Sequence, residues 1–347
     1  MTEVNCCVDN NMTAYKPNQA IQTSSWARYW LSIVDFGKIV NPGAVPSLSE
    51  GDQAVIPIAV PPLSEQVLIT AFLDRETGKI DALVAEQERL MALLKEKRQA
   101  VISQAVTKGL DPNVPMKESG VEWLGAVPEQ WDVTRLKFVT QPDGTGIQIG
   151  PFGGMLKDLP TEHSGYKLYG QQNVISGDFE AGDRWIREET FVSNVSYHVK
   201  PGDLFVTRKG SLGNCRVVPP NTMRGWFDSD TIRVRVDQSK IFANFLQLLL
   251  HEAAYIARQI DETRRGAILS GINSDVVANL QIVLPPPSAQ MILLERLKEH
   301  EAQFNEMFAT AKQAASLLKE RRAALISAAV TGKIDVRGLV STRREAA

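Results

Sequence analysis

The sequence has few of the residues that build disulfides and metal sites. Its 347 residues include three cysteines, Cys6, Cys7 and Cys215, and four histidines. The number of cysteines is odd, and their spacing matches neither a CxxC pair nor a Cys/His ligand set. We therefore expect a reduced, cytoplasmic protein with no metal site of its own.

A long hydrophobic run and an excess of charge of either sign are also missing. No apolar stretch approaches the ~18 residues that a membrane-spanning helix needs, and the start of the chain lacks a basic segment followed by an apolar one. We therefore expect neither a membrane span nor a signal peptide. The formal net charge of -2 gives no electrostatic footprint for nucleic acid over the whole chain.

The usual catalytic patterns are absent from the sequence. The glycine-rich stretch DGTGIQIGPFGG at 143–154 has neither GxGxxG nor GxxxxGK[ST] spacing. A nucleotide site is therefore disfavoured, and a tight loop whose backbone approaches a large ligand is favoured. We find no Ser/His/Asp order, no NPPY-type methyltransferase tetrad and no paired-carboxylate nuclease cluster. An enzyme that acts alone is the least favoured interpretation.

What the chain does contain is an internal repeat, which has to be analysed before local structure. PPLSEQ at 61–66 aligns with PPPSAQ at 285–290, an offset of 224 positions (285 minus 61). LLKEKRQAVISQAVTKGLD at 93–111 aligns with LLKERRAALISAAVTGKID at 317–335 at the same offset, without a gap. The repeat extends loosely upstream to about Ser24, and we align LSEGDQ at 48–53 with LSGINS at 269–274.

Each copy predicts one long helix. Prolines precede Ser64 or Ser288, which we expect to be the N-cap, and Gly and Lys residues mark the C-terminal end. Apolar residues recur at spacings of three and four, which predicts one seam per helix and an antiparallel coiled coil between the two copies. The residues expected to pack in this seam are Ile80, Leu83, Leu90, Leu94 and Val101 in the first helix, and Leu297, Phe304, Phe308, Leu318 and Leu325 in the second.

The region between the helices predicts a mixed α/β domain, because prolines, glycines and turn dipeptides divide it into short segments. The expected fold class is α+β, with this domain flanked by the two helices. We divide the chain into a remnant of a further domain, a first helix, a complete domain, a second helix and a tail, at 1–60, 61–111, 112–284, 285–335 and 336–347.

Basic and amide side chains cluster at the expected loops and strand ends of this domain. Arg can bind guanine through two hydrogen bonds, Gln or Asn can bind adenine, and Lys contacts phosphates. In the strand at 231–237, alternation predicts one buried face and one face that presents two arginines. For any single residue an ordinary surface role is more common, but the set together favours DNA binding. The candidates are Lys157, Gln171, Gln172, Asn173, Arg208, Lys209, Arg233, Arg235, Arg264 and Arg265.

These segments also resemble a known family. KESGVEWLGAVPEQWDVTRLKFV at 117–139 resembles the opening of a target-recognition domain in the DNA specificity subunits of type I restriction-modification systems. GIQIGPFGGMLK, YGQQNVISGDF and GDLFVTRKGSLGN look like the loops and strands that follow in that domain, and PPLSEQ…LLKEKRQAVISQAVTKGL looks like the family's helical spacer. The resemblance covers about 24–335.

The resemblance implies a non-catalytic subunit that recognises half of a bipartite double-stranded DNA site. It implies that the helices dock modification (methyltransferase) subunits, with restriction subunits as further partners, and that S-adenosylmethionine and ATP bind to those partners rather than to this chain.

One feature departs from the family plan, which has two complete recognition domains. Residues 1–60 match only the last part of a first domain and lack its GPFG loop and RKG segment. Either the gene is truncated, or the product is a half-type subunit that pairs with a second copy of itself. A different class of function also stays open: a coiled-coil subunit that only binds or sequesters methyltransferase subunits without recognising DNA.

Overall fold

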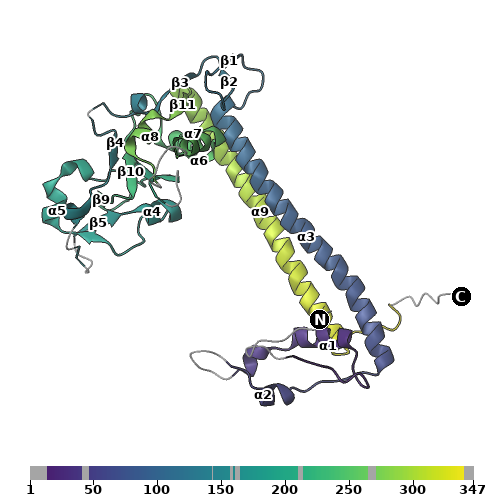
Figure 1. Ribbon diagram of the computed structural model, residues 1–347. Helices are drawn as coiled ribbons and strands as arrows, with labels where there is room; N and C mark the ends of the chain where they lie inside the picture. Colours follow the sequence, from purple (N-terminus) through teal and green to yellow (C-terminus); the bar gives the residue numbers. More distant parts are fainter. Residues whose placement is uncertain are drawn as a thin grey trace. The chain divides into compact units, whose positions relative to one another are not determined.

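The computed structural model describes residues 14–40, 47–142, 144–156, 159–160, 165–209, 214–264 and 271–339. The chain forms two compact units: unit 1 consists of 1–94 and 306–347, and unit 2 consists of 95–305. The fold class is α+β, as predicted, with short strands and two long helices, α3 and α9 (Figure 1). No helix among the described residues is long and apolar enough to cross a membrane.

The long helices are α3 (Leu63–Lys108) and α9 (Pro287–Val330). Each starts directly after prolines, since the carbonyl of Pro62 accepts from the N–H of Gln66 and that of Pro286 from the N–H of Gln290. Ser64 and Ser288 therefore lie within the first helical turn, and their prediction as N-caps is wrong. The helices end before Gly109 and Gly332, whose φ of 81° and 74° favour glycine.

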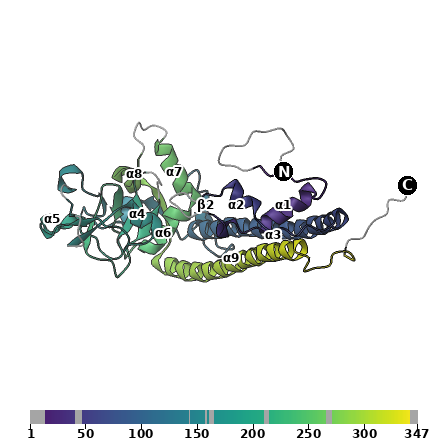
Figure 2. The ribbon, with the colours of Figure 1, turned by 90° about the horizontal axis from the view of Figure 1, so that it is seen from below.

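Within each unit the two long helices lie side by side and run antiparallel (Figures 1 and 2). In unit 1, Arg322 binds Asp81 at 2.7 Å and Lys319 binds Glu88 at 2.9 Å, so the numbering falls along one helix as it rises along the other. In unit 2, Arg98 binds Glu301 at 2.8 Å. The predicted antiparallel packing is confirmed.

The seam between the helices differs from the prediction at three positions. Leu83, Leu90 and Phe308 are 51%, 43% and 41% exposed. The seam passes through Val84, four residues after Ile80, rather than through Leu83, and in the second helix it runs from Phe304 to Ala311 without burying Phe308. Of the other predicted seam residues, Ile80, Leu297 and Phe304 are buried. The half-buried ones are Leu94, Val101, Leu318 and Leu325.

The described residues of unit 2 form four small sheets. The largest has the strand order β4-β10-β7-β8 with antiparallel neighbours, and a three-stranded sheet has the order β6-β5-β9, in which β5 and β9 are parallel. The strands are β1 (Met116–Glu118) with β2 (Ala126–Pro128), β3 (Asp132–Arg135) with β11 (Gln281–Leu284), β4 (Ile147–Ile149), β5 (Tyr166–Tyr169), β6 (Trp185–Ile186), β7 (Leu204–Thr207), β8 (Cys215–Val217), β9 (Gly225–Phe227) and β10 (Thr231–Val234).

The shorter helices attach to these sheets and to the ends of the long helices. Unit 1 has α1 (Ser24–Ile33) and α2 (Glu50–Ala54); unit 2 has α4 (Gln171–Ser176), α5 (Glu188–Ser193), α6 (Ala243–Glu252), α7 (Ala254–Arg264) and α8 (Ser274–Asn279). Single 3-10 turns lie at Phe36–Lys38, Leu136–Val139, Gly153–Leu156 and Val195–Tyr197.

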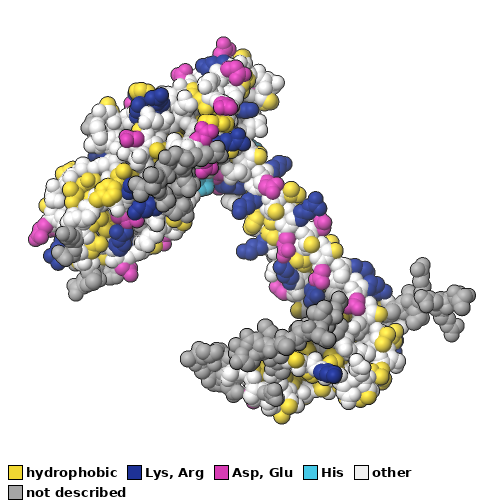
Figure 3. Space-filling model, in the orientation of Figure 1, with side chains coloured by type: hydrophobic (Ala, Val, Ile, Leu, Met, Phe, Trp, Pro, Cys, Tyr) yellow, Lys and Arg dark blue, Asp and Glu magenta, His cyan; other side chains and the backbone are white. Residues whose placement is uncertain are grey.

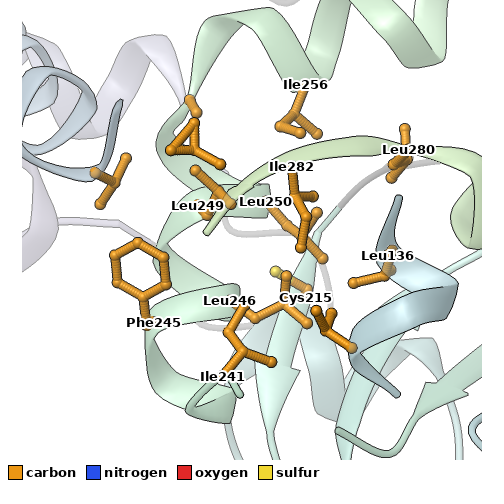
Figure 4. Close-up of a cluster of buried hydrophobic side chains, with 14 of the residues drawn as sticks. Leu136, Cys215, Ile241, Phe245, Leu246, Leu249, Leu250, Ile256, Leu280 and Ile282 are labelled. Atoms are coloured by element: carbon orange, nitrogen blue, oxygen red, sulfur yellow. The ribbon is translucent and has the colours of Figure 1, made fainter. Parts of the chain in front are cut away.

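The core of unit 2 lies between the four-stranded sheet and α6, where apolar side chains of the strands and helices meet (Figure 4). The apolar residues of α6 recur on one face, which is what a helix packed on a sheet needs. Cys215 lies in this cluster, and burial raises the pKa of its thiol to about 12, so the thiol is uncharged and inert. The labelled side chains that meet there are Leu136, Cys215, Ile241, Phe245, Leu246, Leu249, Leu250, Ile256, Leu280 and Ile282.

Both units fasten a short helix to a long one with the same glutamine. In unit 1, the amide of Gln66 accepts from the N–H of Thr23 and donates to the carbonyls of Ile21 and Pro61. In unit 2, the amide of Gln290 makes the equivalent bonds to Phe242, Lys240 and Pro285. Both glutamines are fully buried, so each clamp satisfies three backbone groups inside the protein.

The repeat continues upstream at the same offset of 224 positions. Ser49 caps α2 by accepting from the N–H of Asp52, and Asn273 caps α8 by accepting from the N–H of Val276. Since 273 minus 49 is 224, the predicted alignment of 48–53 with 269–274 is wrong by three residues. That alignment places the Leu-Ser pair at 48–49 on the Leu-Ser pair at 269–270. In the structure, the residue that corresponds to Ser49 by its role as N-cap is Asn273.

Candidate nucleic-acid interface

One edge of the four-stranded sheet collects several of the predicted DNA-binding residues. At this edge β4 and β7 end and the antiparallel β10 between them begins, with Thr231 opposite Thr207 and Ile232 opposite Ile149. Strand β5 ends at the same place, because the N–H of Asp228 donates to the carbonyl of Tyr169. The loops after β4, β5 and β7 therefore surround the turn 228–230, and we call this region the sheet edge.

Arg208 follows β7 and is held in place by backbone groups of the sheet edge. Its Nε donates to the carbonyl of Ile272 at 3.1 Å, and its Nη1 donates to the carbonyl of Ser229 at 3.1 Å. The guanidinium lies 5.2 Å from the ring centroid of Phe152, an exposed aromatic in the loop after β4. These contacts fix the orientation of the guanidinium, as a group that recognises a base requires.

Lys209 adjoins Arg208 and is more exposed. Its Nζ lies 2.7 Å from a carboxylate oxygen of Asp230, and 55% of its side chain is exposed. An exposed ion pair of this kind contributes little to stability and can exchange partners with a phosphate. Lys209 therefore suits a backbone contact rather than base recognition.

Gln171 and Gln172 reach the same edge from α4. The prediction placed them in the break of a strand, whereas they form the first turn of a helix that follows β5 directly. Gln172 is exposed, and the Oε1 of Gln171 has no hydrogen-bond partner within the part of the chain that the structure describes. Both amides therefore have unused hydrogen-bonding capacity in the first turn of the helix that follows β5.

Sequence reasoning missed two residues at the sheet edge. Arg184 forms an ion pair with Asp228, a carboxylate that is 6% exposed, while 40% of the Arg184 side chain remains exposed. Phe152, which is 58% exposed, stacks under Arg208. Phe152 could have been found as an aromatic between glycines in GPFGG, but no local pattern distinguishes Arg184 from other arginines.

Two predicted DNA-binding residues, Asn173 and Arg233, are structural instead. Asn173 is fully buried, and its side chain accepts from the N–H of Gly170 and donates to two backbone carbonyls. Arg233 is fully buried and donates to the carbonyl of Thr145 and to Oε1 of Gln148, both at 2.8 Å. Their prediction as DNA contacts is wrong, because both side chains are fully buried and hydrogen-bonded inside the domain.

Arg235 is also structural. Its Nε and Nη2 bind the two carboxylate oxygens of Asp203 at 2.7 Å and 2.8 Å, and 12% of its side chain is exposed. Strand β10 lies in the middle of the sheet, with α6 packed over one face and Phe227 of β9, whose ring centroid is 5.3 Å from the Arg233 guanidinium, over the other. The prediction of one exposed, arginine-bearing face is wrong because both faces of the strand are covered.

The remaining predicted residues cannot be placed. Lys157 and Arg265 lie outside the described residues, and Arg264 is the last residue of α7, with its side chain outside them too.

The glycine-rich stretch is explained partly by the protein itself. A side chain on Gly150 would come within 2.0 Å of the carbonyl oxygen of Asp228, and one on Gly146 within 2.7 Å of the carbonyl oxygen of Gln141. These two glycines let neighbouring backbones of the domain meet, so the expectation that they admit a ligand is wrong for them. Gly153, with φ of 54°, lies in the loop that carries Phe152.

Residues for a metal site do not assemble in the described part of the chain. No group of three or more His, Cys, Asp or Glu side chains there could hold a metal ion. The ring of His198 stacks on Phe191 at 3.8 Å, and His251 contacts Glu252 at 3.2 Å. Burial alone would raise the pKa of Glu252, but His251 and Arg98 outweigh it, so the pKa lies below its usual value.

Comparison with known proteins finds specificity subunits of type I restriction enzymes among the similar sequences. The chain is 23% identical to the Type I restriction enzyme StySPI specificity subunit of Salmonella potsdam, over 80% of this chain and 56% of that protein. It is 23% identical to the Type I restriction enzyme MjaVIII specificity subunit of Methanocaldococcus jannaschii, over 82% of this chain and 63% of that protein. The chain is similar to the specificity subunit of type I restriction enzymes, called HsdS. It spans about 60% of the length of these relatives, and no family model matches it.

Solved structures share the fold of this HsdS-like chain. The HsdS subunit from Thermoanaerobacter tengcongensis matches with a TM-score of 0.53 and 16% identity, covering 91% of this chain and 72% of that one. A chain from a structure described as showing complex assembly and conformational transition of the type I R-M system matches with a TM-score of 0.57 and 17% identity, covering 90% and 69%.

Proposed function

We propose that the chain is the sequence-recognising subunit of a type I restriction-modification complex and binds double-stranded DNA through the sheet edge of unit 2. The observation that carries the proposal is the position of Arg208. Its guanidinium is oriented by two backbone carbonyls and by Phe152, and Lys209 and Gln172 lie at the same edge. Such a set offers a bidentate donor for guanine, amides for adenine and a cation for phosphate.

The proposal gives this chain no catalytic role. The sheet edge pairs cations with acids that serve as structural anchors, as Asp228 does for Arg184. The methyl donor and ATP would bind to partner subunits, in line with the sequence expectation. The near-neutral net charge fits a complex in which partner chains supply many of the phosphate contacts.

Modification subunits are the proposed partners of the long helices in unit 1. Apolar side chains that the seam does not use stay exposed there: Leu83, Leu90, Leu93, Met307, Phe308 and Leu317, between 41% and 56%. Figure 3 shows hydrophobic side chains interspersed with acidic and basic ones along the visible face of the helices. Apolar patches bordered by charge are typical of protein–protein interfaces.

The test is reconstitution. The chain is co-expressed with a cognate modification subunit, and DNA binding of the complex is measured against sequence and salt, together with mapping of methylated sites in the host DNA. We expect salt-dependent binding and methylation at one bipartite sequence. A complex that assembles but binds all sequences equally would support the other candidate, a subunit that only sequesters modification subunits.

The symmetry of the methylated site is a second outcome of the same experiment. Two copies of a chain with one recognition domain would be related by a two-fold axis and would recognise an inverted repeat. If the chain acts through a second copy of itself, we expect a palindromic bipartite site with one fixed spacer length. Methylation of an asymmetric bipartite site would show that a different chain or segment recognises the other half.

A further inference from the structure

A strand of unit 2 has a counterpart in unit 1 that pairs with no strand among the residues that the structure describes. In unit 2, β11 pairs antiparallel with β3, so that Ile282 lies opposite Thr134 and Leu284 opposite Asp132. At the offset of 224 positions, β11 corresponds to 57–60 in unit 1. The described residues of unit 1 contain no strand that pairs with 57–60.

The direction of the backbone N–H groups shows which edge of this segment is open. In unit 2, the N–H of Gln281 donates to Gln259 at 2.8 Å and the N–H of Val283 donates to the hydroxyl of Tyr255 at 3.1 Å. Both acceptors lie on α7. Since successive N–H groups of a strand point to opposite sides, those of Ile282 and Leu284 face β3.

The same alternation applies to unit 1. Pro57 replaces Gln281, whose N–H faces away from the partner strand. The proline, which has no N–H, therefore stands at a position where none is needed for pairing. Proline is tolerated in a paired strand only at such positions. Ile58 and Val60 replace Ile282 and Leu284, and neither N–H makes a hydrogen bond among the described residues. Within the described residues, the segment therefore keeps the two donors that a second strand would use.

An apolar groove lies beside these donors. Its volume is about 790 Å³, and Trp30, Ile33, Ile56, Ile58 and Val330 are among the side chains that line it. Trp30, Ile33, Ile56 and Ile58 are only partly buried, and the neighbouring Val55 is 80% exposed.

The counterparts of the groove residues in unit 2 are covered. Leu280, Ile282 and Val106 correspond to Ile56, Ile58 and Val330, and they are 4%, 0% and 0% exposed. They share one buried cluster with three residues of the segment that contains β3, namely Trp131, Leu136 and Val139. In unit 2, this segment supplies the apolar side chains that the groove of unit 1 lacks.

We propose that the groove of unit 1 binds an extended strand of a second polypeptide, antiparallel to 57–60 and carrying the apolar pattern of Trp131–Val139, WDVTRLKFV. The proposal follows from the position of this segment in unit 2, where it pairs with β11 and covers the corresponding apolar residues. A second copy of the chain is a poor donor, because the sequence contains this segment once and it is already paired with β11. Addition of a strand to an open edge gives affinity through backbone bonds and specificity through alternate side chains.

The experiment titrates the full chain into a fluorescently labelled peptide with the sequence of Gln130–Thr140 and measures anisotropy. We expect saturable binding at one site. Val60→Pro removes an N–H that faces the groove and should weaken binding at least about tenfold. Ala59→Pro is the matched control, because it removes an N–H that faces away, and it should change the affinity less than about twofold. Thermal unfolding checks that both variants fold.

Three outcomes would overturn the proposal. The first is equal binding to the Val60→Pro and Ala59→Pro proteins, which would place the peptide elsewhere, including at β11 by exchange. The second is equal binding of a scrambled peptide. The third is no peptide binding together with self-association that Val60→Pro abolishes, which would make a second copy the occupant. No DNA takes part, so failure here leaves the proposed DNA recognition untouched.

Discussion

The two units share the elements that join a short helix to a long one, but they differ in the sheets that their described residues form. Gln66 and Gln290 make the same three bonds, and Thr107 and Thr331 donate to the same kind of carbonyl four residues earlier. Only unit 2 contains the four-stranded sheet and its edge among the described residues. The repeated parts therefore attach the short helices to the long ones, and the candidate DNA contacts lie in the part that is not repeated.

The buried arginine of unit 2 tests this division most severely. Arg233→Ala removes donors to Thr145, Gln148 and Ser196 from a fully buried site in β10. We expect a loss of about 3–5 kcal/mol in the free energy of unfolding of unit 2, from roughly 1–3 kcal/mol for each buried acceptor left unpaired, with partial relaxation. Urea denaturation measures it. Exposed Arg258 offers the control, and equal stability of the Arg233→Ala and Arg258→Ala proteins would contradict a structural role.

The glutamine clamps test whether the two units are equivalent. Gln66→Ala and Gln290→Ala each leave one N–H and two carbonyls without a partner. We expect each to cost about 2–4 kcal/mol, from roughly 1–3 kcal/mol per buried unsatisfied group with partial relaxation. Gln303→Ala, on the exposed side of α9, should cost little. A large effect in one unit and none in the other would show that the repeat is conserved in form only.

A contact of unit 2 predicts a dependence on pH. Glu252 is 5% exposed, lies 3.5 Å from Arg98 on α3, and has a pKa below the usual 4.5. A lowered folded pKa means that its contribution is complete above about pH 4.5 and is lost as the pH falls through the folded value. We expect Glu252→Gln to cost about 1.5–3 kcal/mol at pH 7, typical of a hydrogen bond to a charged group.

The pH profile supplies the check. Stability of the natural chain and of Glu252→Gln should converge as the pH falls below about 4.5. A gap that stays constant down to pH 3 would show that packing, rather than charge, causes the difference.

The seam of unit 1 gives the smallest expected effect. Val84 is 9% exposed and its neighbour Leu83 is 51% exposed. We expect Val84→Ala to cost about 1–2 kcal/mol and Leu83→Ala less than about 0.5 kcal/mol in thermal unfolding, because only the first removes buried methyl groups. The reverse order would restore the seam predicted from the sequence.

The long helices could be predicted from the sequence, because a heptad-like apolar pattern and flanking prolines are local signals, and the repeat shows both of them twice. Choosing Leu83 over Val84 was an error of one residue, and sequence alone rarely fixes which of two adjacent apolar residues faces the partner. The fold class followed from the short, turn-punctuated segments between the helices. The strand that carries Arg233 and Arg235 was misjudged because its alternation matched a half-exposed strand, whereas buried arginines satisfied by carbonyls and by Asp203 produce the same pattern.

The candidate site was predictable where strand ends carry polar residues. Arg208, Lys209, Gln171 and Gln172 were found because basic and amide residues after strands are common in binding loops. Arg184 was not found, since its place beside Asp228 depends on contacts between residues 44 positions apart. Asn173 could not be separated from its neighbours, because only the structure shows that it caps α4 rather than facing solvent.

The position of Arg208 allows the most direct test of DNA recognition by the sheet edge. Methylated sites are mapped for the chain, for Arg208→Ala and for Arg258→Ala, each co-expressed with the same modification subunit. We expect Arg208→Ala to lose preference at one or two base pairs, a discrimination of about 1–3 kcal/mol, while the other positions of the site and the Arg258→Ala pattern stay unchanged. A uniform loss of methylation at all sites, with the sequence preference intact, would contradict base recognition by Arg208.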